Sequence, residues 1–299
     1  MTEQSLASTP FVAGGSATNG GPASYFRRDI EVGESLRRAI LKVTALGIAV
    51  PRLNGVRIGD EVLAPGWTSY RHRLLVRSHD VTDVVRPGAN TLAAVVGEGW
   101  AAGPLTWDLR PHLWTDRPVL WARLELDYGD RVEVIDTSDG FRVGEGGVRS
   151  NGIYHGETFD ARLEPKGWDA PGFDDTDWSP AQPFAWNHSA LVEEPVPPIK
   201  RIEEIEPVAV ATSPAGSVIV DFGQVLTGWV RLTVQGDAGT EITLRGCKLL
   251  TPEGEPQFET LRTAEATDRY VLSGGEPETW EPESTFHGFR YVQVSGWPG

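Results

Sequence analysis

The feature that most constrains this chain is a recurrence of short runs in which about every second residue is apolar. Residues 39–47 (AILKVTALG), 90–97 (NTLAAVVG) and 217–223 (SVIVDFG) are examples. A period near two places successive side chains on opposite faces of a strand, whereas a helix needs a period of about 3.6. The runs stop at Gly, Pro, Asn or Asp, and Asn54-Gly55 lies where a hairpin turn is expected. The pattern predicts an all-β protein of antiparallel strands.

The length of 299 residues predicts two domains, since one domain takes roughly 100–200 residues. Residues 1–24 are small and polar, which predicts a flexible leader. We expect a first β-sandwich over 25–186 and a second over 207–299. The proline-rich stretch 187–206 shows no alternation and is expected to be an extended linker.

The composition excludes several classes of function. The net charge is −15, and basic residues are scattered singly, so neither nucleic acid nor an anionic membrane is an expected partner. The single cysteine, Cys247, excludes disulfides within the chain and thiolate metal sites. No apolar run approaches the roughly 20 residues of a membrane span. The first residues lack the basic start of a signal peptide, which predicts a cytoplasmic location.

Catalytic motifs are not recognisable in the sequence. Residues 97–103 (GEGWAAG) have the wrong glycine spacing for a dinucleotide-binding loop and are expected to form a structural turn. Residues 173–178 (FDDTDW) lack the register of a calcium-binding loop. The 42 acidic residues do not single out a pair for glycoside hydrolysis. No catalytic residue and no metal ligand is therefore nominated.

Aromatic residues in predicted loops carry more information. Exposed aromatic rings stack on the C–H faces of sugars, while nearby carboxylates and amides bind the hydroxyls. Packing in the core is the alternative explanation for each of them. The residues in question are Trp67, Tyr70, Trp100, Trp107, Trp114, Tyr154 and Trp168.

Several strings together resemble one enzyme family. Residues 53–103, with LAPGWTSY, and 150–178, with YHGETFDAR, are similar to the N-terminal β-sandwich of bacterial α-L-rhamnosidases. Residues 220–246, with DFGQ, and the later strings DRYVLSGG and FHGFRYV resemble the concanavalin-like sandwich that follows in these enzymes. The resemblance extends over residues 25–299 and implies two jelly-roll or concanavalin-like sandwiches.

The resemblance also implies a division of labour within a longer parent protein. In this family an (α/α)6 barrel that follows the sandwiches removes terminal α-L-rhamnose from glycosides with inversion, using one carboxylic acid and one carboxylate. Residue 299 lies where that barrel would begin, so we expect these 299 residues to be inactive alone. The implied partners are L-rhamnose-containing glycosides and the barrel itself.

The loop of residues 150–157 is the place where sugar contact is expected. Asn151 and Glu157 would supply oxygen atoms and Tyr154 a stacking face, with Trp107 and Trp100 as further aromatic contacts.

The same loop has a purely structural interpretation. In that case Gly152 and Gly156 turn the chain and Glu157 pairs with Arg162. Some carbohydrate-binding modules that resemble the first sandwich bind rhamnose through calcium. Ser150 stands where calcium would favour a carboxylate, so no cofactor is expected and calcium is only the alternative.

Three functional hypotheses stay open. The chain is the structural and carbohydrate-binding segment of an α-L-rhamnosidase-type hydrolase, a free-standing lectin-like protein, or a docking module without a ligand of its own. A docking module predicts apolar patches on the second sandwich.

Overall fold

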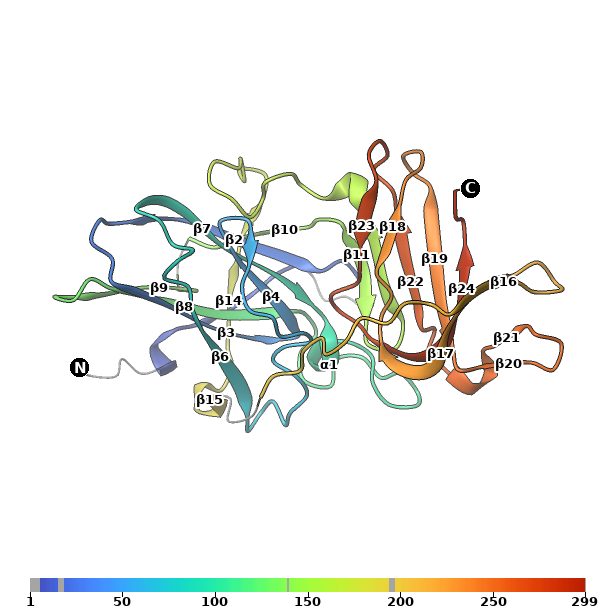
Figure 1. Cartoon of the computed structure of the whole chain (residues 1–299). Coiled ribbons are helices and arrows are strands. Elements are labelled where there is room, and N and C mark those ends of the chain that lie inside the picture. Colours follow the sequence, from blue (N-terminus) through green and yellow to red (C-terminus); the bar gives the residue numbers. More distant parts are fainter. Residues whose placement is uncertain (1–5, 16–18, 139, 194–196, 299) are drawn as a thin grey trace.

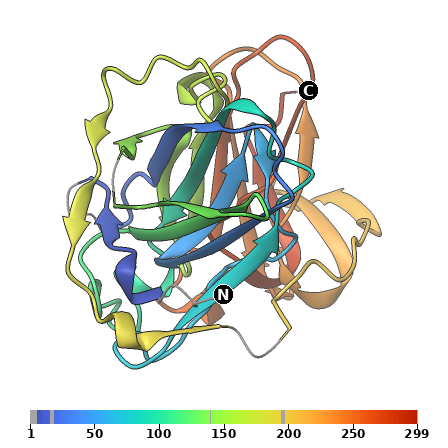
Figure 2. The same ribbon diagram turned by 90° about the vertical axis from the view of Figure 1, so that its left-hand side faces the viewer.

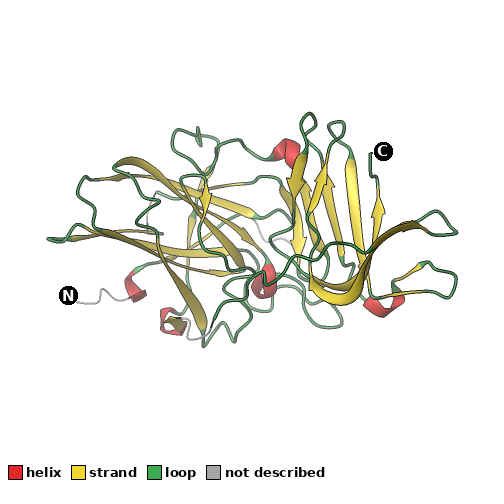
Figure 3. Cartoon of the chain, in the orientation of Figure 1, coloured by secondary structure: helices red, strands yellow, loops and turns green. Residues whose placement is uncertain are grey.

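The molecule consists of two β-rich bodies that lie end to end, with the N-terminal half at one end and the C-terminal half at the other (Figure 1). The computed structural model describes residues 6–15, 19–138, 140–193 and 197–298. Strands dominate both bodies (Figure 3), which confirms the all-β prediction. Within the described residues the only α-helix is α1 (Gly99–Ala102), and no helix is long and apolar enough to cross a membrane.

Two facing sheets form the first sandwich, and Figure 2 looks onto it with the second sandwich behind. The first sheet contains, in spatial order, β14 (Gln182–Phe184), β1 (Phe11–Ala13), β8 (Val119–Asp127), β3 (Arg38–Leu46), β6 (Leu74–Asp80) and β15 (Leu191–Glu193), with β9 (Val132–Asp136) paired to β8. The second sheet contains β13 (Ser179–Pro180), β10 (Arg142–Gly144), β2 (Ser24–Val32), β7 (Gly88–Gly97), β4 (Ile48–Leu53) and β5 (Val56–Arg57).

Alternate side chains of these strands fill the space between the two sheets. Leu41 and Val43 of β3 face inward with Leu92 and Ala94 of β7, and all four are buried in one apolar cluster. Burying an aliphatic side chain of this size contributes about 1.5–3 kcal/mol. The predicted alternation in 39–47 and 90–97 therefore has a direct packing cause.

The leader prediction is wrong for the part of residues 1–24 that forms β1. This strand is buried and pairs with both β8 and β14, because its three apolar residues fit between these two strands. Just before it, the Thr9 carbonyl accepts a hydrogen bond from the Trp121 indole at 2.9 Å. Farther along, the amide of Gly20 donates to the buried Glu98 carboxylate at 2.9 Å. Residues 1–5 and 16–18 lie outside the described residues.

The second sandwich is built on one seven-stranded sheet. In spatial order its strands are β11 (Val148–Gly152), β12 (Gly156–Asp160), β22 (Thr267–Val271), β19 (Glu241–Cys247), β24 (His287–Ser295), β17 (Val218–Gly228) and β16 (Ala209–Thr212). Two small sheets accompany it, β18 (Leu232–Val234) with β23 (Glu278–Trp280) and β20 (Leu249–Leu250) with β21 (Pro256–Gln257). Its apolar cluster includes Leu244 and Tyr270 of the large sheet and Trp280 of the small one.

Short 3-10 helices lie at connections between strands. They are η1 (Leu6–Ser8), η2 (Ala161–Leu163), η3 (His188–Ala190) and η4 (Glu259–Leu261).

The β11–β12 hairpin does not belong to the sheets of the first sandwich, although the predicted range 25–186 contains it. β12 pairs in parallel with β22, so Thr158 lies opposite Arg269 and the hairpin forms one edge of the second sheet. Phe159 stacks on Tyr270, with ring centroids 6.0 Å apart. Val148 instead packs with Tyr25 of β2. The hairpin therefore joins the two bodies, as Figure 1 shows.

The predicted linker is fixed to both sandwiches. β15 pairs in parallel with β6, and the Val62 amide donates to the Ile199 carbonyl at 2.9 Å. Arg201 then donates to Glu281 of the second sandwich at 2.7 Å. Beyond that contact Ile202 is 97% exposed. Residues 194–196 of the linker lie outside the described residues.

Candidate functional site

The five residues predicted to contact sugar fall into a buried group and an exposed group. Asn151, Glu157 and Trp100 are buried, with exposed fractions of 1, 2 and 8%. Tyr154 is 36% exposed and Trp107 is 75% exposed. Only the last two can present a surface to a ligand in this structure.

Asn151 joins the first sandwich to the leader. Its side-chain oxygen accepts a hydrogen bond from the Glu98 amide at 2.7 Å, and its side-chain nitrogen donates to the Gly21 carbonyl at 2.9 Å. Both polar atoms are thus used within the protein. The prediction that Asn151 binds sugar is corrected to a structural role.

Glu157 lies inside the junction between the two sandwiches. Its carboxyl group accepts hydrogen bonds from the amides of Ser284 at 2.9 Å and Glu283 at 3.3 Å. Burial, followed by the nearby charge of Glu283, raises the pKa of Glu157 to about 8. The group therefore holds a proton at neutral pH and does not face solvent. The expected pairing with Arg162 is also wrong, because Arg162 binds Asp160 at 2.7 Å.

A histidine–aspartate pair extends this buried junction. His287 on β24 lies 3.0 and 3.1 Å from the two carboxylate oxygens of Asp268 on β22. The amide of Glu157 on β12 donates to the same carboxylate at 3.0 Å. Three strands of the second sheet are thus linked by polar contacts between buried residues.

Trp100 packs in the apolar core beside β3 and β8 rather than on the surface. Its ring lies 6.3 Å from that of Phe286, so it also touches the second sandwich. The preceding Gly99 has a φ of +52°, and an added Cβ would lie 3.0 Å from the Gly47 carbonyl carbon. The run 97–103 has a structural role, but it contains the short helix α1 where only a turn was predicted, and the predicted sugar contact by Trp100 is corrected.

The predicted loop does not fit a calcium ion. Calcium needs six to eight oxygen ligands, mostly carboxylates and carbonyls. The Asn151 oxygen and the Glu157 carboxyl group already accept backbone hydrogen bonds. Among the described residues, no group of three or more His, Cys, Asp or Glu side chains is arranged to hold a metal.

The two exposed aromatic residues are held by one segment of the second sandwich, residues 262–266. The Thr263 hydroxyl donates to the Trp107 carbonyl at 3.3 Å. The amides of Glu265 and Ala266 donate to the Tyr154 carbonyl at 3.1 and 3.0 Å. Trp107 and Tyr154, which are distant in the sequence, therefore both contact the segment 262–266 through their backbone carbonyl groups.

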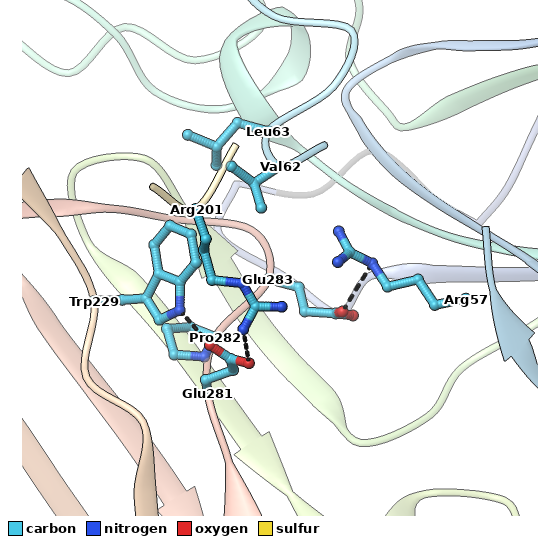
Figure 4. A pocket seen from close by; sticks show the side chains of 8 residues that line it. All are labelled: Arg57, Val62, Leu63, Arg201, Trp229, Glu281, Pro282 and Glu283. Atoms are coloured by element: carbon cyan, nitrogen blue, oxygen red, sulfur yellow. Dashed lines mark hydrogen bonds and ion pairs between the residues drawn. The ribbon is translucent and has the colours of Figure 1, made fainter. Parts of the chain in front are cut away.

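A small pocket lies where the linker crosses from one sandwich to the other (Figure 4). The Trp229 indole and Arg201 both donate to Glu281, at 2.6 and 2.7 Å. Arg57 lies 3.7 Å from Glu283 on the opposite side. The charges are satisfied by one another, so the pocket acts as a clamp between the bodies. Sequence reasoning did not identify it, because its residues come from four separate segments.

Solved structures place this fold in the α-L-rhamnosidase class. α-L-Rhamnosidase from Aspergillus terreus superposes with a TM-score of 0.96 and 35% identity, over all of this chain and 35% of that one. The Streptomyces avermitilis enzyme, solved with L-rhamnose, gives 0.90 and 42% identity over 94% of this chain and 27% of that one.

The family follows from the sequence comparison. Residues 34–203 match the α-L-rhamnosidase N-terminal domain, and residues 211–299 match the bacterial α-L-rhamnosidase concanavalin-like domain. The chain belongs to this family, which confirms the resemblance. The Streptomyces avermitilis enzyme is 44% identical over 269 residues, and one from Formosa agariphila is 32% identical over 279 residues. The chain spans only 26 and 30% of the length of these two relatives.

Proposed function

We propose that this chain is the supporting, non-catalytic part of a protein that removes terminal α-L-rhamnose from glycosides with inversion. The observation that carries this proposal is the consecutive match of both rhamnosidase domains, in the order in which the two sandwiches occur. The chemistry would belong to the remaining part of the parent protein. The sandwiches would support that part and contact the substrate.

Sugar contact is assigned to the surface that carries Trp107 and Tyr154. Support for this comes from the 75% exposure of Trp107, since an exposed indole ring can stack on the C–H face of a sugar. The ligand class, a rhamnose-containing glycoside, follows from the family.

Exposed valines on the second sandwich favour a docking role beside sugar contact. Val208, Val210 and Val225 are 59–68% exposed at the β16–β17 edge. Val210 lies opposite Val220 in register, so it continues the apolar face of the sheet beyond its covered part. An exposed apolar patch of this kind is typical of an interaction surface. We infer that the remaining part of the parent protein packs there.

An activity assay tests the main proposal. The chain and its full-length parent would be incubated with an aryl α-L-rhamnoside, and release of the aryl group would be measured. We expect turnover by the parent and none by the 299 residues alone. Turnover by the short chain, or an inactive but folded parent, would contradict the proposal.

A further inference from the structure

The exposed ring of Trp107 is held in place by the second sandwich. The guanidinium carbon of Arg262 lies 4.9 Å from the ring centroid, within the range of a cation–π contact. The Thr263 hydroxyl fixes the Trp107 backbone through its carbonyl. Despite both contacts, three quarters of the tryptophan stays exposed, at 75%.

The first-sandwich loop that carries Trp107 is anchored at both of its ends. Before it, Leu105 forms a bridge with Arg110, and both are held by two backbone hydrogen bonds of 2.7 and 2.9 Å. After it, the ring of Trp114 packs edge-on against the buried Tyr70, with centroids 5.1 Å apart. An aromatic ring on an anchored loop loses little conformational entropy when a ligand stacks on it.

Both loops at this surface contain residues in an unfavourable backbone region. Of the eight described non-glycine residues with positive φ, five lie on these two loops: Thr106, Leu109, His112, Arg262 and Ala266. Such conformations cost free energy and tend to gather at ligand-binding sites. Arg262, whose φ is +57°, is the residue that places its guanidinium over the Trp107 ring.

Polar side chains belong to the same segments as these contacts. Glu265 lies on the same segment, and its side-chain oxygen is 3.5 Å from the Nδ1 atom of His155. Tyr154, the residue before His155, adds a second aromatic side chain that is 36% exposed. An exposed indole ring, with carboxylate and imidazole groups on neighbouring segments, suits a sugar, in which C–H faces alternate with hydroxyls.

We propose that Trp107 and the segment 262–266 form one composite saccharide-binding surface, to which both sandwiches contribute. Trp107 stacks on the ring of a terminal 6-deoxyhexose, and Arg262 is a positioning residue that fixes the orientation of the indole. A 6-deoxy sugar suits this surface because its methyl group enlarges the apolar face. The choice of L-rhamnose as the ligand rests on the proposed function.

NMR titration of the intact chain with methyl α-L-rhamnoside tests the proposal. The indole N–H signal of Trp107, assigned by its loss in Trp107→Ala, is expected to shift in a saturable manner. Trp107→Ala should weaken binding at least about tenfold, as the loss of one stacked aromatic ring usually does. The matched control is Trp67→Ala, which removes a tryptophan that is 61% exposed and should leave the affinity unchanged.

Substitutions of Arg262 distinguish its proposed role in orienting the Trp107 indole from a general contribution to the stability of the fold. Arg262→Gln should move the free Trp107 indole signal and weaken binding several-fold, while Arg262→Lys, which keeps a cation, should restore much of both. Thermal unfolding of each variant confirms that it is folded. Equal binding by Arg262→Gln and the unchanged chain would overturn the positioning role.

Other outcomes would contradict the composite saccharide-binding surface but not the proposed function. Saturable binding that survives in Trp107→Ala would place the sugar elsewhere on the chain. Equal binding of methyl α-D-glucoside would overturn the choice of a 6-deoxy sugar. No binding to the folded chain at all would overturn the composite surface, while the activity of the parent protein would still decide the proposed function.

Discussion

The two sandwiches reach stability in different ways. The first encloses an apolar cluster between two complete sheets, with Leu41 fully buried at its centre. The second has one large sheet whose edge is the β11–β12 hairpin, supplied by the chain before the linker. Where the hairpin meets the rest of that sheet, the carboxyl groups of Glu157 and Asp268 are buried. A domain boundary drawn along the sequence therefore need not follow the hydrogen bonds of the sheets.

This contrast predicts different responses to change. Apolar side chains do not ionise, so their packing adds no pH dependence of its own. A junction that contains a protonated carboxyl group is sensitive to pH. The first sandwich should depend on the linker segment that forms β15, and the second should depend on the hairpin.

The largest effect on stability is expected from Gly156→Ala, which adds a Cβ atom where the hairpin meets β22. Gly156 has a φ of +110°, and an added Cβ would lie 2.0 Å from the Thr267 carbonyl oxygen. We expect a loss of at least about 3 kcal/mol in the free energy of unfolding, measured by urea denaturation. Gly152→Ala in the same hairpin is the control, because its Cβ would meet only His155 at 3.6 Å. Equal stability of the two variants would refute the close contact.

A pH-dependent effect is expected from Glu157→Gln. The pKa of Glu157 is raised from 4.5 to about 8, so the folded state holds a proton that the unfolded state has lost between these values. Its stabilising contribution is complete below pH 4.5 and is lost as the pH rises to about 8, at about 1.4 kcal/mol per pH unit. Glu157→Gln, which cannot ionise, should therefore gain stability over the unchanged chain as the pH rises.

Glu278→Gln is the matched comparison and should behave in the opposite way. Burial acts to raise the pKa of Glu278, but hydrogen bonds from the Tyr270 hydroxyl and the Ser273 amide outweigh it and lower the pKa. The stability from these bonds is present above the ordinary pKa of 4.5 and is lost in acid. The variant should be less stable at neutral pH and approach the unchanged chain in acid. The same trend for both variants in urea titrations would contradict the assignment.

The smallest effect is expected in the linker, from Lys200→Ala. Lys200 pairs with Asp60 at 2.7 Å, but both side chains are exposed. Exposed ion pairs add little to stability, so no resolvable change in the urea midpoint is expected. Arg201→Ala, which breaks the contact with Glu281 in the clamp, should shift the midpoint more. The reverse order would show that the clamp does not join the two bodies.

Local pattern was sufficient to predict the strands, since alternation and turn residues act over a few positions. It was not sufficient for contacts between distant segments. Asn151 is polar and was expected at the surface, but its partners, Glu98 and Gly21, are backbone groups far away in the chain. The parallel pairing of β12 with β22 joins residues more than 100 positions apart, and no local signal marks it.

The candidate site shows the same limit. The exposed loops of Trp107 and Tyr154 were predictable, because both residues lie beside turn-forming residues. Their common support, the segment 262–266, was not, because it belongs to the other sandwich and carries no motif. The buried Glu157 was mistaken for a surface ligand, since a carboxyl group is rarely buried without a charged partner.

Native-state hydrogen exchange determines whether the β11–β12 hairpin is part of the second sandwich. Leu244→Ala removes a buried side chain from β19, which does not pair with the hairpin. We expect the amides of Thr158, Phe159 and Asp160 to exchange faster in this variant, together with those of β22 and β24. The amides of β3 and β7 in the first sandwich should be unchanged. Hairpin amides that keep their protection along with β3 and β7 would contradict the account.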